Sequence, residues 1–185
     1  FEATILLLSF AVGIGILGWH SYLQSKNIVF SDLEAILLAA DSTRGIKQKL
    51  VKASADMIDA GYERPKIFEG TDIKQRHATL MAIAPTKSSS GILGQVSLGI
   101  EPYETNYFVK DLAKVKMTYR NPYLTKLLQS KGLDTDGIWM SILNNRGSVQ
   151  HLTQLSAHEK KVFRTFEEIP QMSILQQASA RQSSI

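Results

Sequence analysis

The sequence contains no cysteine and no strong excess of charge of either sign. Without cysteine it can form no disulfide, no thiolate metal site and no thiol nucleophile. The 21 lysines and arginines stand against 17 aspartates and glutamates, which leaves a net charge of +4. This small surplus does not favour an anionic partner, and we therefore expect no binding of nucleic acid.

Motifs of known catalytic and metal sites are absent as well. The stretch Ser88–Gly91 is no nucleophile elbow, because the sequence contains no G-x-S-x-G. Asp134 and Asp136 resemble the start of a calcium-binding loop, but Asn145 stands where the bidentate glutamate would be. The 4 histidines show no metal-binding spacing. We therefore predict a protein that is not an enzyme and that binds neither a metal nor a cofactor.

Fixed charges are also missing between Glu2 and Lys26. The run Ala3–Trp19 reads ATILLLSFAVGIGILGW, in which only Thr4 and Ser9 are polar. Because about 20 helical residues cross the hydrocarbon core of a bilayer, this run predicts a membrane-spanning helix. It starts near the first residue of a chain without an initial methionine, which suggests that a peptidase has removed a leader.

The glycines of this run allow more than one interpretation. Gly13–Gly18 fits the dinucleotide pattern G-x-G-x-x-G, but that pattern needs a strand before it in a soluble unit, so we reject a nucleotide site. Ala11, Gly15 and Gly18 instead make a strip of small residues on which another helix could pack closely. The same glycines could let the segment bend or unwind, because glycine weakens a helix.

The whole chain predicts an α+β protein in four segments, with a long N-terminal hydrophobic α-helix before a small globular αβ head domain. Residues 1–25 form the membrane or filament-core helix, and residues 26–61 are its amphipathic continuation. That continuation is one long helix or a second one, because Ser31–Glu34 matches a capping box. The head domain covers residues 62–175, and residues 176–185 form a mobile polar tail.

Local signals predict a few elements of the head domain. Pro122 can begin a helix that Gly132 ends, and Ser156–Glu159 is a second capping box. The alternation over Gln95–Ile100 predicts a strand. The segment Tyr107–Tyr119 mixes the periods of a strand and a helix, so its class stays open.

The start of the chain, Phe1-Glu2 followed by ATILLLSFAVGIGILGWHSYLQ, resembles type IV pilins and pseudopilins, in particular the type IVb group. Members of this family begin with an apolar helix whose fifth residue is a glutamate, a place that Glu2 takes if three residues precede Phe1. The resemblance implies a structural subunit that is held in the inner membrane and then polymerises through this helix into an extracellular filament on the cell surface. It implies copies of the same chain and the pilus assembly machinery as partners, and a role in cell adhesion.

Residues expected to act in subunit assembly are Phe1, Glu2, Ala11, Gly15 and Gly18. An unpaired carboxylate in hydrocarbon needs a partner, and Glu2 could pair with the free α-amine of a neighbouring subunit. An alternative function is a single-pass, membrane-anchored accessory or assembly subunit of a larger bacterial or organellar complex.

Overall fold

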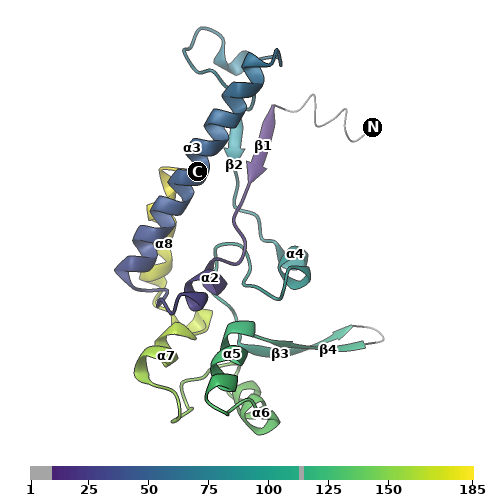
Figure 1. Cartoon of the computed structure of the whole chain (residues 1–185), viewed down its shortest axis with the longest axis vertical. Helices are drawn as coiled ribbons and strands as arrows, with labels where there is room; N and C mark the ends of the chain where they lie inside the picture. Colours follow the sequence, from purple (N-terminus) through teal and green to yellow (C-terminus); the bar gives the residue numbers. More distant parts are fainter. Residues whose placement is uncertain (1–9, 113–114) are drawn as a thin grey trace.

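The structure is a computed structural model that describes residues 10–112 and 115–185. Figure 1 shows an elongated molecule in which the long helix α3 (Leu33–Asp59) lies beside the C-terminal helix α8 (Gln171–Gln182). A small parallel sheet lies next to the upper half of α3, and an antiparallel hairpin projects from the lower half of the molecule.

The first part of the chain is a β–α–β unit. Strand β1 (Ala11–Ile14) pairs in parallel with strand β2 (Thr79–Met81). The register pairs Ala11 with Thr79 and Ile14 with Met81. Parallel strands cannot be joined by a tight turn, so a long crossover must connect them. Helix α2 (Trp19–Ser25) and helix α3 provide this crossover.

Helices α3 and α8 pack against each other along one side of each helix. The buried residues on these sides are spaced by four: Ala35, Ala39 and Thr43 on α3, and Ser173, Gln177 and Arg181 on α8. Residues four apart lie on the same face of a helix, so each set forms a stripe. Small side chains on α3 leave room for the longer polar side chains of α8.

The second part of the chain is built around the antiparallel hairpin. Strands β3 (Tyr107–Leu112) and β4 (Val115–Arg120) form it. The remaining helices are α4 (Lys87–Ile92), α5 (Pro122–Ser130), α6 (Asp136–Asn144) and α7 (Ala157–Val162). Short 3-10 turns occur at Lys66–Phe68 and Phe166–Glu168.

Buried apolar side chains gather in separate clusters. One cluster joins the hairpin to α5, α6 and α7, and its fully buried members include Leu124, Leu128, Trp139, Ile142, Val149 and Val162. Another joins α2, α3 and the start of α8, and includes Trp19, Leu23, Phe30, Ala35, Ala39 and Ile169. Burial of this apolar surface is the main favourable contribution to folding.

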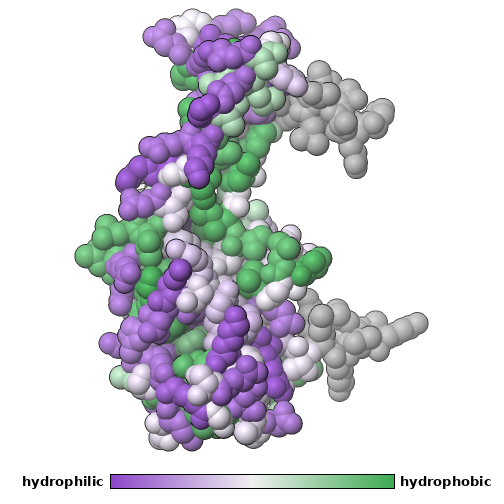
Figure 2. All heavy atoms as spheres, viewed as in Figure 1, coloured by the Kyte–Doolittle hydropathy of each residue, from purple (hydrophilic) through white to green (hydrophobic). Residues whose placement is uncertain are grey.

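Not all apolar surface is covered by the described residues. Figure 2 shows apolar residues across the middle of the molecule, including a group at the start of α3, and hydrophilic residues over both ends. Leu33 and Leu37, on the first turns of α3, are 68% and 56% exposed. Exposed apolar surface of this kind is typical of a contact with further protein.

The predicted long hydrophobic helix is wrong. The middle of the apolar run forms strand β1, and helix α2 has only 7 residues. Gly18 before α2 and Asn27 after it have φ angles of 76° and 57°, which no continuous right-handed helix contains. Strands of parallel sheets are often continuous apolar runs, so an apolar run is found in such strands as well as in membrane helices.

The predicted membrane span is not found either. In the part of the chain that the structure describes, no helix is both long enough and apolar enough to cross a bilayer. Helix α3 has 27 residues, but charged side chains such as Lys47, Lys49 and Lys52 interrupt its sequence. Residues 1–9 of the predicted span lie outside the described residues.

Several local predictions are confirmed. Helix α5 begins at Pro122, and the Asn121 side chain accepts hydrogen bonds from the first turn. The second capping box forms as expected, because the Ser156 N–H donates to Glu159 at 2.7 Å and the Glu159 N–H donates to Ser156 Oγ at 3.2 Å. The first predicted capping box, Ser31–Glu34, does not form, because α3 begins at Leu33 and its N-cap residue, Asp32, makes no side-chain cap.

Other local predictions differ from the structure. The segment Gln95–Ile100 forms turns and bends instead of a strand. Polar composition indicated a mobile tail from residue 176, yet this segment continues α8 and buries Gln177 and Arg181. The boundary predicted after residue 175 therefore falls inside a helix, and the other domain boundaries stay predictions.

Close backbone packing makes Gly15 sensitive to any side chain. A Cβ atom there would lie 2.7 Å from the Ala82 carbonyl oxygen, so Gly15→Ala must displace the segment after β2. We expect a loss of about 1–3 kcal/mol in the free energy of unfolding, as for other overpacked sites. Urea unfolding measures this loss.

Gly45 provides the matched control, because it lies inside α3 and a Cβ atom there has nothing within 4 Å. Gly45→Ala should raise the free energy of unfolding by up to about 1 kcal/mol, since alanine is the better helix former. Equal effects of both substitutions would mean that the contact of Gly15 with Ala82 does not constrain the fold.

Candidate functional site

A cavity of about 640 Å³ lies between α4, the loop that follows it and the base of the hairpin. Its polar side chains come mostly from α4 and from the segment before β3: Lys87, Ser88, Ser90, Gln95, Glu104 and Thr105. Its aromatic side chains come from the hairpin and the residues before it: Tyr103, Phe108 and Tyr119. A cavity of this size with converging polar groups is typical of a small-molecule site.

The polar side of the cavity is held by an unusual backbone conformation. Thr86, which precedes α4, has a φ of +47°, a value that β-branched residues rarely adopt. Its Oγ1 accepts the Gly99 N–H at 2.8 Å, and its carbonyl accepts the Ser90 N–H at 3.0 Å. These bonds fix the direction in which α4 leaves the loop, and with it the place of Lys87 beside the cavity.

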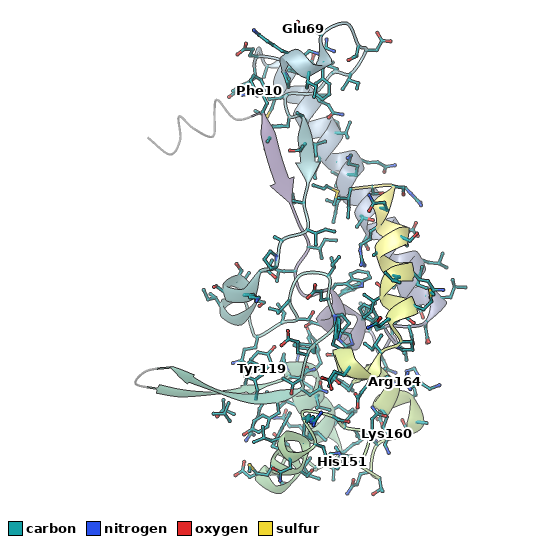
Figure 3. All side chains as sticks on the ribbon, turned by 180° about the vertical axis from the view of Figure 1, so that it is seen from behind. Phe10, Glu69, Tyr119, His151, Lys160 and Arg164 are labelled. Carbon is teal, nitrogen blue, oxygen red and sulfur yellow. The ribbon has the colours of Figure 1, made fainter. Side chains whose placement is uncertain are left out.

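The aromatic side is fixed by hydrogen bonds to a single carbonyl. The Tyr103 hydroxyl donates to the Gln95 carbonyl at 2.9 Å, and the Tyr119 hydroxyl donates to the same oxygen. Phe108 stacks on Tyr119 with ring centroids 4.5 Å apart. Figure 3 shows Tyr119 at the base of the hairpin, on the side toward α4. Burial raises the pKa of both tyrosines, so both phenols stay protonated donors.

A buried histidine supports the cavity from behind. His20 lies in α2 and is fully buried, and its Nδ1 accepts the Tyr103 N–H at 3.0 Å. This bond puts the ring proton on Nε2, on the side of the Val162 carbonyl. Burial lowers the pKa of His20 from 6.5 to about 4, so the ring is neutral at neutral pH.

The residues predicted from the sequence lie elsewhere. Phe1 and Glu2 are outside the described residues. Ala11 lies in β1, Gly15 lies against the segment after β2, and Gly18 precedes α2. None of these described residues lines the cavity, and their predicted role in subunit contacts stays a prediction.

The sequence interpretation missed the residues that do line the cavity. Lys87 and the three serines Ser88–Ser90 follow a short apolar run, and we expected no site among them. A lysine among hydroxyl groups after an apolar run is a usable signal for an anion site. Among the described residues, no group of His, Cys, Asp or Glu side chains is placed to hold a metal ion.

Comparison with known proteins gives consistent similarities. Residues 69–185 match the family model of the ribonucleotide reductase barrel domain. The ribonucleoside-diphosphate reductase large subunit of Invertebrate iridescent virus 3 is 38% identical over 178 residues, which cover 95% of this chain and 28% of the relative. The corresponding large subunit of Invertebrate iridescent virus 6 is 35% identical over 179 residues, covering 95% of this chain and 18% of the relative.

A solved structure is similar over almost the whole chain. The class Id ribonucleotide reductase alpha subunit of Actinobacillus ureae is 49% identical, with a TM-score of 0.85. The similarity covers 96% of this chain and 32% of that subunit. The chain therefore spans at most about a third of the length of these relatives.

These similarities correct the expectations that came from the resemblance to pilins. The matching proteins are reductase subunits, so a pilus or pseudopilus subunit, a filament of identical copies and a role in adhesion are wrong. The prediction that the protein is not an enzyme is also wrong, because the relatives are large subunits of enzymes. The inner-membrane and extracellular-filament locations are wrong too, because they followed from the resemblance to pilins and the matching proteins are reductase subunits.

The buried, neutral His20 makes stability depend on pH. Its pKa in the folded state is below its ordinary value, so its contribution is complete above about pH 6.5 and is lost as the pH falls toward 4. The shift from 6.5 to about 4 corresponds to roughly 3 kcal/mol. We expect His20→Gln, which keeps an acceptor but does not titrate, to lose this part of the acid sensitivity.

Urea unfolding of the wild type and of His20→Gln at about pH 7 and about pH 5 measures the difference. His151→Gln is the control, because His151 is exposed and its removal should leave most of the acid sensitivity in place. An identical pH dependence of the wild type and His20→Gln would show that the ring is not kept neutral by burial.

Proposed function

Since this chain belongs to the family of the ribonucleotide reductase barrel domain, we propose that it forms part of a large subunit that binds a ribonucleoside diphosphate for reduction. The substrate class comes from the names of the relatives, which are ribonucleoside-diphosphate reductases. Because those relatives are large subunits, the proposed partners include a smaller subunit of the same enzyme.

The observation that carries this proposal is the position of the cavity in the chain. All the residues that line it, from Lys87 to Tyr119, fall within the part that matches the family model. A diphosphate needs a cation and hydroxyl donors, and Lys87, Ser88 and Ser90 supply both on one wall. We assign the diphosphate to this wall.

The opposite wall holds the cavity in shape. The hydroxyls of Tyr103 and Tyr119 meet at the Gln95 carbonyl, which ties the hairpin to the loop after α4. The described residues of the site therefore bind and orient the ligand. Electrons for the reduction cannot come from a thiol of these 185 residues, because the sequence has no cysteine.

Removing the charge of Lys87 should weaken substrate binding. In the large subunit that contains this chain, we expect Lys87→Ala to raise the KM for a ribonucleoside diphosphate about tenfold, with little change in kcat. A hydrogen bond to a charged group contributes about 1.5–3 kcal/mol, which corresponds to a change of this size or larger. Lys87→Arg should recover most of the affinity, because it keeps the positive charge.

Steady-state kinetics and equilibrium binding of the nucleotide check this expectation. Lys66→Ala is the control, because Lys66 is an exposed lysine outside the cavity. A KM for Lys87→Ala equal to that of the control would remove Lys87 from the diphosphate site. A loss confined to kcat would place its role in a later step.

A further inference from the structure

The base of the hairpin has two different faces, because successive residues of a strand point to opposite sides. Tyr107 is 7% exposed and belongs to the core cluster that contains Trp139. The next residue, Phe108, lines the cavity instead, and so does Tyr119. The register of the two strands places Phe108 directly opposite Tyr119. The hairpin therefore presents a pair of aromatic rings to the cavity.

These two rings form a fixed surface. Their centroids lie 4.5 Å apart, and their planes are 17° from parallel. The Tyr119 hydroxyl donates to the Gln95 carbonyl, and the Tyr103 ring packs against the Tyr119 ring with centroids 6.3 Å apart. Phe108 is thus supported by a partner ring that is itself held by the loop after α4.

The second face of the Phe108 ring is open to a ligand. Among the described residues, Tyr119 is the one aromatic side chain in contact with Phe108. Phe108 is only half-buried, and it lies in the lining of the cavity of about 640 Å³. Further lining side chains are apolar: Ile92, Val96 and Leu98. They offer no hydrogen bond to a phosphate or a sugar hydroxyl, so this part of the cavity favours a flat, apolar group.

We propose that Phe108, supported by Tyr119, is the platform on which the base of the nucleotide stacks. This inference rests on the proposal that the cavity binds a ribonucleoside diphosphate with its phosphates on the wall of Lys87, Ser88 and Ser90. The base is the flat part of that molecule. Every base has a π-face, so stacking on an aromatic side chain stabilises a bound base whatever its identity. Phe108 therefore contributes affinity for all four bases.

The first experiment measures equilibrium binding to the large subunit that contains this chain. The ligands are ADP, GDP, CDP, UDP and ribose 5-diphosphate, which lacks only the base. Phe108→Leu keeps an apolar side chain but removes the ring, so we expect the Kd for each nucleotide to rise about tenfold. The Kd for ribose 5-diphosphate should not change. Phe166→Leu is the matched control and should change no Kd, because Phe166 is 39% exposed and lies outside the cavity lining.

Lys87→Ala separates this proposal from the assignment of the diphosphate. It should raise the Kd for ribose 5-diphosphate as well as for the nucleotides, because all of these ligands carry the phosphates. If Lys87→Ala raises them and Phe108→Leu raises none, the base does not stack on Phe108 while the diphosphate site stands. If only Phe108→Leu acts, the diphosphate assignment fails instead. An equal rise for nucleotides and ribose 5-diphosphate in Phe108→Leu would mean a general loss of the cavity and would overturn the stacking.

The second experiment tests the contact directly. Phe108→Trp places a fluorescent ring on the platform, and a stacked base quenches the emission of tryptophan. Each nucleotide should quench the added emission with saturation over the concentrations at which it binds, and ribose 5-diphosphate should not. Phe166→Trp is the control, and its added emission should not respond. Emission of Phe108→Trp that stays constant while the nucleotide binds, or that ribose 5-diphosphate quenches equally, would overturn the proposal.

Discussion

The hydrogen bonds between α2 and the loop after α4 hold the two parts of the molecule together. The N–H of Gly18 donates to the Ser97 carbonyl at 3.0 Å, and the N–H of Trp19 donates to the Gly99 carbonyl at 3.1 Å. Ser21 and Ser97 exchange two further bonds through the Ser21 hydroxyl and the Ser97 hydroxyl, at 2.8 and 3.2 Å. Each of these backbone groups is buried or nearly so, and each would be costly to leave without a partner. The position of the cavity follows from them, because they place the loop that forms its floor.

Much of the local structure could be predicted from the sequence because short-range physics decides it. Pro122 suits the first turn of a helix, because its φ is already helical and the N–H that it lacks would have no partner there. The Ser156–Glu159 capping box satisfies two N–H groups at the start of a helix that would otherwise have no partner. The run around Gly13 and Gly15 is different. Apolar runs occur both in spanning helices and in strands of parallel sheets, so hydropathy alone does not separate the two, and the pairing of β1 with β2 identifies the strand.

The candidate site was less predictable because it depends on distant segments. Nothing near Lys87 in the sequence indicates that Tyr103 and Tyr119 will face it, since the hairpin reaches α4 only through the folded chain. His20 shows no role in the sequence, because the backbone N–H that it accepts belongs to Tyr103, 83 positions away. The same holds for Arg181, whose burial follows from packing on α3 and not from the polar sequence around it.

The hydrogen bonds between α2 and the residues that follow α4 also affect the rate of folding. The bonds of Ser21 with Ser97 and of His20 with Tyr103 join residues 76 and 83 positions apart. Contacts of such long range form slowly, because the entropy of closing the loop is lost before any contact is gained. Helix α3, inside that loop, needs only local contacts and can form on a much shorter timescale. The cavity is therefore a late product of folding, and a chain emerging during synthesis has no site until residues beyond Tyr119 have been made.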